Sequence, residues 1–390
     1  MQIIIHRGTH QIGGCATEIR NGSTRILIDF GAELPDADGN VSPDTLKIDG
    51  LNYGKADFDG VFLTHYHGDH MGLISFVPES IPVFMGSTAV KILTAFSNRT
   101  QDKYKCTPDR IRPLYALKPI MIGNMKVTPI PADHSAYDAF MYLVETEGKR
   151  ILHTGDFRLH GFRGKATSKL IHRYASDIDV LIIEGTLLSR NNHNIMSESE
   201  LQKEISNEIL SHKYVFALCA STNIDRLASF YNATPYGRYF VCDKYQKEIL
   251  DSIAANSKSQ WYQFGKTLTY GKNLELEKRG FVMPVRANNK FKEIMSQYPD
   301  SFLIYSIWKG YLDGRSHALS EFIAPFKKSG NIRYLHSSGH VTATDTQAFC
   351  NLVNPKIGVI PIHTENGNNF EKLNLKCPML RLNDGEVFSL

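Results

Sequence analysis

Several features that mark specialised classes of protein are missing from this sequence of 390 residues. Its six cysteines include no C-x-x-C pair, so neither a disulfide framework nor a cysteine-rich zinc module is expected, and reduced thiols in a cytoplasmic protein are favoured. No stretch of about 18 apolar residues occurs, so we expect no helix that spans a membrane. The first eight residues resemble a first strand more than a signal peptide.

A strong charge of either sign is missing as well. The 44 lysines and arginines against 40 aspartates and glutamates give a net charge of +4, which is too mild to indicate nucleic-acid binding by bulk charge. The net charge does not exclude a local basic groove. Hydrophobic residues at 42% and charged residues at 22% exclude a largely disordered chain. At about 100–200 residues per domain, the length predicts two or three domains.

The expected pattern of secondary structure changes twice along the chain. Short strands separated by turns are expected first, then strands that alternate with longer helices, and finally short strands again. The alternating segment predicts a parallel α/β sheet inserted into another domain. A helix is expected over 197–212, where Ser197 and Glu200 fit a capping box. The expected domain boundaries are 1–195 and 331–390 for the outer domain and 196–330 for the insertion.

The one unusual feature of the composition is its 15 histidines. Four potential metal ligands lie within six consecutive residues. These follow an expected strand at 60–64 and are His65, His67, Asp69 and His70. Imidazole with carboxylate suits Zn²⁺, and burying four such groups for no purpose would be costly. Four ligands are few for two metals, so more should come from other strand ends. The candidates there are His134, Asp156 and His363.

The order of these residues resembles the metallo-β-lactamase fold: H-x-H-x-D-H, a single later histidine, a G-D turn after a strand, and a late histidine. The resemblance implies an αββα sandwich with two bound Zn²⁺ ions, with Mn²⁺ as the alternative ion. It implies one zinc on His65, His67 and His134. It implies a second on Asp69, His70 and His363, with Asp156 bridging. Asp29, in the segment L-I-D-F-G, is similar to the fold's early strand-end aspartate and would orient ligands by hydrogen bonds.

Three more motifs surround the predicted insertion. Glu184 in I-I-E-G-T, the segment H-S-S-G-H at 336–340 and His363 resemble motifs A, B and C of the β-CASP nucleases, with the RNase J-like enzymes nearest by pattern. A histidine at motif C resembles the RNA-processing branches, whereas DNA-directed branches typically carry valine there. RNase J proteins usually continue into a further C-terminal domain, and the sequence printed here ends at Leu390.

The resemblance therefore predicts a zinc-dependent ribonuclease that hydrolyses phosphodiester bonds of single-stranded RNA, through a two-metal site in the cleft between the two domains. Asp69 and Asp156 would position the attacking water, and His340 would contact the phosphate and protonate the leaving oxygen. Glu184 would set the tautomer of a neighbouring histidine. The expected contacts to RNA phosphates are Ser221, Thr222, Asn223, Arg226, Ser337, Ser338 and Gly339.

Three other functions remain as alternatives. A DNA nuclease on the same scaffold is disfavoured by the histidine at motif C. A small-molecule metallohydrolase acting on an ester, thioester or lactam is disfavoured by the insertion and by the S-S-G-H segment. A non-catalytic binding subunit is disfavoured because all seven ligand positions are filled. The sequence does not separate exonuclease from endonuclease, or a monomer from a homo-oligomer.

Overall fold

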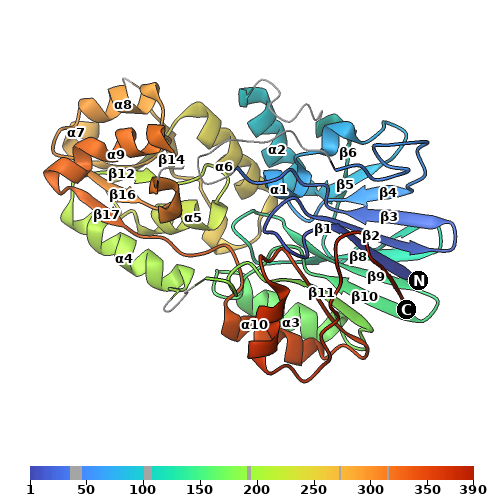
Figure 1. Cartoon of the computed structure of the whole chain (residues 1–390). Coiled ribbons are helices and arrows are strands. Elements are labelled where there is room, and N and C mark those ends of the chain that lie inside the picture. Colours follow the sequence, from blue (N-terminus) through green and yellow to red (C-terminus); the bar gives the residue numbers. More distant parts are fainter. Residues whose placement is uncertain (36–45, 101–107, 191–194, 272–273, 314–315) are drawn as a thin grey trace. The chain divides into compact units, whose positions relative to one another are not determined.

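The structure, a computed structural model, describes residues 1–35, 46–100, 108–190, 195–271, 274–313 and 316–390. These residues form two compact units (Figure 1). The first unit comprises Met1–Leu34, the described part of Val41–Asn194, and Gly339–Leu390; the second is chiefly Ile195–Ser338. The second unit is thus an insertion in the sequence of the first. The predicted domain boundaries at residues 195 and 330 stay a prediction, and each unit is described below by itself.

Two sheets form the centre of the first unit. The first sheet has the strand order β19 (Val387–Ser389), β1 (Gln2–Arg7), β2 (Ala16–Asn21), β3 (Thr24–Ile28), β4 (Gly60–Phe62), β5 (Val83–Gly86), β6 (Ile111–Leu114). The second has the order β18 (Gly358–Ile362), β11 (Val180–Glu184), β10 (Lys149–His153), β9 (Phe140–Thr146), β8 (Met125–Pro131), β7 (Ile120–Ile122). Strands β3 to β6 run parallel to one another, as do β10, β11 and β18.

The core between the two sheets is built by residues that alternate along each strand. Ile3 and Ile5 of β1 meet side chains of the second sheet, among them Val180 and Ile182 of β11. Successive strand residues point to opposite faces, so Leu181 faces the other way and is buried there as well. A sheet that is apolar on both faces must be covered by another layer on its outer side.

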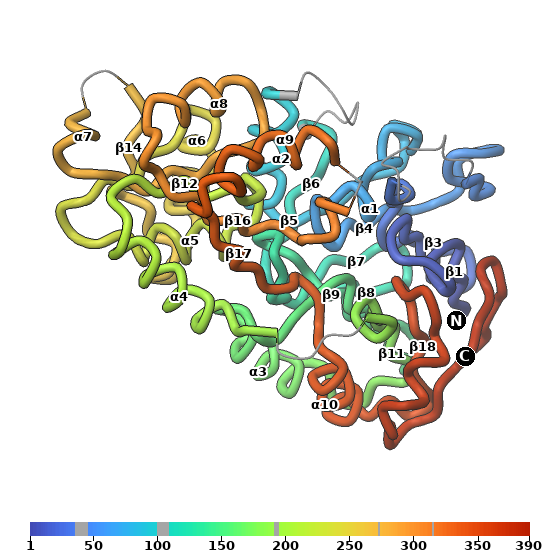
Figure 2. Tube along the Cα trace, turned by 60° about the vertical axis from the view of Figure 1, so that its left-hand side comes forward, coloured from blue at the N-terminus to red at the C-terminus, as the bar shows by residue number. Residues whose placement is uncertain are grey.

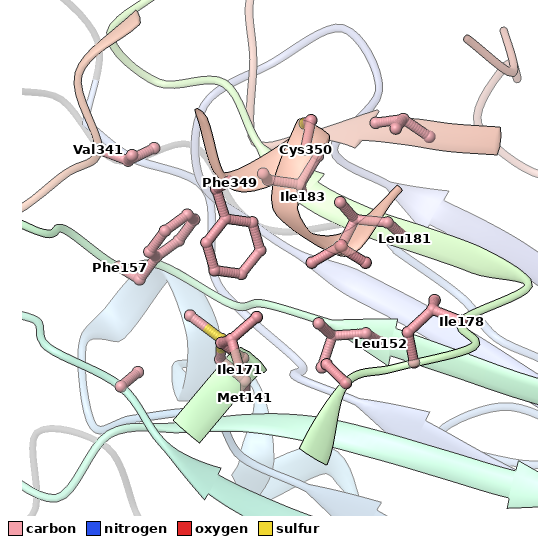
Figure 3. Packing of buried hydrophobic residues seen from close by; sticks show 14 of the residues in the cluster. Met141, Leu152, Phe157, Ile171, Ile178, Leu181, Ile183, Val341, Phe349 and Cys350 are labelled. Carbon is pink, nitrogen blue, oxygen red and sulfur yellow. The ribbon is translucent and has the colours of Figure 1, made fainter. Parts of the chain in front are cut away.

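Helices supply that outer layer. In the first unit they are α1 (Gly68–Met71), α2 (Ser87–Thr100), α3 (Gly164–Tyr174) and α10 (Ala343–Val353). Helices α3 and α10 cover the second sheet, where Phe349 of α10 packs on Phe157 with ring centroids 4.7 Å apart (Figure 3). Helix α2 lies along β5 and β6 of the first sheet (Figure 1). The first unit is therefore an αββα sandwich.

The second unit is a six-stranded sheet in which all paired strands are parallel. Its order is β14 (Thr267–Thr269), β13 (Tyr239–Cys242), β15 (Phe281–Val285), β12 (Tyr214–Leu218), β16 (Phe302–Tyr305), β17 (Ile332–Tyr334). Its helices are α4 (Glu198–Ser211), α5 (Ile224–Ala233), α6 (Lys244–Asn256), α7 (Leu276–Arg279), α8 (Asn289–Ser296) and α9 (His317–Ser329). The parallel α/β insertion predicted from the alternating pattern is confirmed.

Two local predictions can be checked directly. The capping box at the start of α4 is present, because Ser197 Oγ accepts from Glu200 N at 3.2 Å and Ser197 N donates to Glu200 Oε2 at 2.8 Å. Within the described ranges, no helix combines the length and apolar character needed to cross a membrane. The two termini of the chain lie close together on the first sheet, where β19 pairs with β1 (Figure 2).

Candidate metal centre

The predicted ligands follow the ends of strands from both sheets of the first unit. His65 and His67 follow β4, and His134 follows β8. Asp156 follows β10, and His363 directly follows β18. Because the carboxyl ends of such strands meet at one edge of the sandwich, residues far apart in the sequence come together there.

The first group of potential ligands consists of His65, His67 and His134, whose ligand atoms lie within 4.8 Å of one another. His134 Nδ1 donates to the carbonyl oxygen of Gly339 at 2.7 Å, which leaves Nε2 facing His67 Nδ1 at 3.3 Å. Burial lowers the pKa of His67 to about 4 and holds the pKa values of His65 and His134 well below their usual range. All three rings are therefore neutral, which is the form that binds a metal ion.

The second group consists of Asp69, His70, Asp156 and His363. His70 Nε2 lies 3.1 Å from Asp156 Oδ2, and His363 Nε2 lies 3.3 Å from Asp69 Oδ2. Although burial opposes the charged form, Asp156 and Asp29 raise the pKa of His70 well above its usual value. A buried imidazole that is driven to take up a proton marks a strongly negative local potential. A cation at this point would relieve the same potential.

Two atoms of the centre show that the residues fit a metal ion. His65 Nε2 and Asp156 Oδ1 are buried and have no hydrogen-bond partner among the residues that the structure describes. A buried polar atom without a partner costs about 1–3 kcal/mol, so such atoms are expected to have a ligand. Ring nitrogens with carboxylate oxygens are suitable donors for Zn²⁺ and also for Mn²⁺.

Hydrogen bonds behind the ligands fix their orientation. Asp29 accepts from Thr64 N at 2.7 Å and from His70 Nδ1 at 2.8 Å. Thr64 Oγ1 donates to Asp29 Oδ2 at 2.8 Å, so it accepts from His65 Nδ1 at 3.0 Å. In each ring, Nε2 is then the nitrogen left for a cation. The sequence analysis named Asp29 as an orienting residue, and that role stays a prediction, whereas the contacts of Thr64 were missed.

A similar arrangement holds His363 and His340. Glu184 Oε1 accepts from Phe157 N at 2.8 Å, and Oε2 accepts from Thr186 Oγ1 at 2.5 Å and from His340 Nδ1 at 2.9 Å. Because its hydrogen is given to Glu184, Thr186 Oγ1 accepts from His363 Nδ1 at 2.7 Å. Glu184 thus contacts His340, and its role in setting the tautomer of a histidine stays a prediction. Thr186 was missed, and its signal was its place two residues after Glu184.

His340 lies at the edge of the centre. Its side chain is 24% exposed, and its Nδ1 lies 3.6 Å from Asp156 Oδ2. Burial opposes protonation, but the carboxylates of Glu184 and Asp156 raise the pKa of His340 to about 9. The ring is therefore a proton donor at neutral pH in this environment.

The short helix α1, which carries Asp69 and His70, is held by backbone hydrogen bonds from another part of the chain. Cys15 N donates to Asp69 O at 3.1 Å, and Phe30 N donates to His70 O at 2.8 Å. Gly31 passes so close that a Cβ at that position would lie 1.7 Å from Asp69 O. Only glycine fits there, so residue 31 is part of the support for the ligands.

Most of the predicted phosphate contacts are engaged elsewhere. Ser221 Oγ accepts from Arg286 Nη1 at 3.1 Å, and Asn223 caps α5 by accepting from Arg226 N at 3.1 Å. Ser337 Oγ donates to Met196 O at 2.6 Å. Thr222 and Ser338 are half-buried, and Gly339 contributes its carbonyl to His134. The role of these residues in binding phosphate stays a prediction.

The prediction for Arg226 needs correction. Its side chain is completely buried. The guanidinium pairs with Glu198, with Nε 2.8 Å from Oε1, and donates to the carbonyls of Ser306 at 3.2 Å and Ser337 at 3.4 Å. A substrate phosphate does not reach a guanidinium enclosed in this way. The sequence could not reveal this, because Glu198 lies 28 positions away on another helix.

Comparison with known proteins agrees with the fold. The family described as "Beta-lactamase superfamily domain" matches residues 24–209. Ribonuclease J of Helicobacter pylori (strain 26695) is 21% identical over 92% of this chain, which spans 55% of that relative's length. An "RNase J-like protein" of Methanocaldococcus jannaschii is 30% identical over 46% of this chain and 41% of its own length. A crystal structure of a protein of unknown function from Enterococcus faecalis has a TM-score of 0.80 at 21% identity, covering 100% of this chain and 99% of that one.

The chain therefore carries a domain similar to the beta-lactamase superfamily over residues 24–209, and it resembles ribonucleases J over most of its length. The predicted fold class, a metallo-β-lactamase sandwich with an inserted α/β domain, is confirmed. Use of divalent metal ions is general in this superfamily, and the two groups of ligands described above are where this chain could hold them.

Proposed function

We propose that the protein is a zinc-dependent ribonuclease that hydrolyses phosphodiester bonds in single-stranded RNA. The observation that carries the proposal is the pair of adjoining ligand groups, seven residues in all, with His340 held beside them by Glu184. The names of the relatives support RNA as the substrate, and the histidine at motif C, His363, favours RNA over DNA by family resemblance. A DNA nuclease of the same superfamily is the alternative.

The chemistry needs an activated water, charge relief at the phosphate and a proton for the leaving oxygen. Two Zn²⁺ ions, when bound, would supply Lewis-acid activation of water and neutralise the phosphoryl oxygens. Asp69 and Asp156, which lie beside His363 and His70, would accept hydrogen bonds from the water and orient it. His340 would give its proton to the leaving oxygen, and Glu184 keeps the ring fixed through Nδ1 for that transfer.

The decisive test is cleavage by zinc-loaded protein of a 5′-labelled single-stranded RNA, its DNA counterpart and a nitrophenyl ester. The double variant Asp69→Ala/His70→Ala should lose the second ligand group, and RNA cleavage should fall by roughly 10³-fold or more, because metal assistance contributes several kcal/mol. Zinc content, measured by mass spectrometry, should fall with it. His317→Ala, which removes an 88% exposed histidine of α9, is the matched control and should change neither value.

Each outcome discriminates between functions. Cleavage of RNA that depends on Asp69 and His70 supports the proposal, and the product ladder distinguishes exonuclease from endonuclease. Cleavage of DNA alone would favour the DNA nuclease. Hydrolysis of the ester alone would favour a small-molecule metallohydrolase. Protein that binds two zinc ions and cleaves none of the three substrates would contradict the proposal and favour a binding subunit. Repeating the assay with Mn²⁺ tests the choice of ion. The cytoplasmic location and the homo-oligomer stay predictions.

A further inference from the structure

Cys15 is a buried residue beside the second ligand group that the proposed chemistry does not use. It follows the turn at Gly13 and Gly14, and its side chain is 1% exposed. Its backbone is fixed on both sides, because N donates to Asp69 O at 3.1 Å and O accepts from Gly31 N at 3.0 Å. The same segment that supports α1 therefore also places a sulfur atom at the metal centre.

The sulfur lies among ligand atoms. Cys15 Sγ and one ring nitrogen each of His70 and His363 all lie within 4.8 Å of one another. In both rings Nδ1 is engaged, by Asp29 in His70 at 2.8 Å and by Thr186 in His363 at 2.7 Å. The nitrogens that remain for a cation are therefore Nε2 of His70 and Nε2 of His363, two residues of the second group.

A second observation points to a ligand at this place. Asp156 Oδ1 is buried, has no hydrogen-bond partner among the described residues, and lies 3.6 Å from His363 Nδ1. Asp156 belongs to the ligand group that shares His70 and His363 with Cys15. A cation there would have sulfur, nitrogen and oxygen donors around it, so the sulfur would be more than a small apolar side chain filling the core.

We propose that Cys15 Sγ is a further donor to the cation held by Asp69, His70, Asp156 and His363, and that it biases this position toward a thiophilic ion such as Zn²⁺ over Mn²⁺. Soft thiolate ligands favour zinc, whereas carboxylate and water favour manganese. The thiolate is the ligand form, so coordination forms a metal–sulfur bond and releases the thiol proton to solvent. The inference rests on the metal centre of the proposed function and does not depend on the identity of the substrate.

Cobalt substitution tests it without an activity assay. The protein is freed of metal, titrated with Co²⁺ and examined by absorption spectroscopy. Thiolate coordination should give an intense near-ultraviolet charge-transfer band in the wild type, in addition to the weaker visible bands of Co²⁺. Cys15→Ser and Cys15→Ala should lose the ultraviolet band and keep the visible ones. Cys242→Ser is the matched control, because this buried cysteine at the end of β13 belongs to none of the ligand groups among the described residues.

Competition between Zn²⁺ and Mn²⁺ gives the second readout. We expect Cys15→Ser to lower the preference for zinc about tenfold, which is in the range that changes around a metal site produce. Visible cobalt bands without a charge-transfer band in the wild type would overturn the role of Cys15 alone. Failure to bind cobalt or zinc would overturn both this proposal and the metal-dependent function. A charge-transfer band in protein that does not cleave RNA would support Cys15 and count against the ribonuclease.

Discussion

The two units each bury a cluster of charged side chains, and the clusters differ in how their charge is balanced. In the second unit, Arg226 pairs with Glu198, and the same carboxylate also accepts from Ser229 Oγ at 2.8 Å. In the first unit, carboxylates and imidazoles crowd together, yet His65 Nε2 and Asp156 Oδ1 have no partner within the described part of the chain. The comparison teaches that burial of charge alone does not mark a functional site. What marks it is donor and acceptor capacity that the protein itself leaves unused.

The strongest way to break the balanced cluster is Arg226→Met. The change leaves Glu198 buried without its cation, and we expect the free energy of unfolding to fall by about 3–5 kcal/mol. Urea denaturation measures this loss. Zinc content should not change, because Arg226 is not a metal ligand. The double variant Arg226→Met/Glu198→Leu removes both charges and should recover much of the stability. A single variant as stable as the wild type would show that the pair contributes nothing.

Thr186→Val tests the unbalanced cluster of the first unit by removing a hydrogen-bond partner of the ligand His363. Valine keeps the shape of threonine but cannot accept from His363 Nδ1 or donate to Glu184 Oε2. Loss of such a partner typically costs 10–100-fold in metal affinity, so cobalt titration should show a weakening of about that size. Thr128→Val, at a buried threonine of β8 that is in no ligand group among the described residues, is the control. An unchanged affinity in Thr186→Val would mean that the orientation of His363 is set by other contacts.

Asp243→Asn should have the smallest effect, because this pair is only partly enclosed, with 10% and 15% of the Asp243 and Arg286 side chains exposed. Burial alone would raise the pKa of Asp243, but Arg286 and the amide of Gln246 hold it below its usual value. Because the pKa of Asp243 is lower in the folded state, its carboxylate stabilises the fold at pH values above the pKa of the unfolded state. That contribution is lost as the pH falls through the pKa of the folded state. We expect a loss of ~1 kcal/mol at pH 7 that shrinks below about pH 4, measured by denaturation across that range. A difference independent of pH would contradict the electrostatic explanation.

Much of the fold could be predicted because its signals are local. The capping box of Ser197 and Glu200 spans four residues, and the alternation of strands and helices in the insertion is visible in the hydrophobic pattern. The motif from His65 to His70 is also local, and family resemblance joined it to His134 and His363. Prediction was easiest where a residue's role depends on its neighbours in the sequence.

The rest depends on contacts across the fold. Arg226 looked like a phosphate ligand from its position at the start of a helix, but the structure buries it against Glu198. Thr186 and Thr64 gained their roles from the direction of single hydrogen bonds, which residue type alone does not give. Cys15 is isolated in the sequence and meets His363, 348 positions further along the chain, only through the fold. Such partners are absent from any local pattern.

The pairing of β19 with β1 has a consequence for handling the protein. Val387 to Ser389 cover the backbone of the first strand, and Leu390 N donates to Met1 O at 2.9 Å. Strand β1 carries three consecutive isoleucines from Ile3 to Ile5. Without β19, that apolar strand would become the open edge of a sheet, and open apolar edges recruit strands from other molecules. The pairing of β19 with β1 therefore protects this edge from aggregation, and tags or truncations at residues 387–390 would weaken that protection.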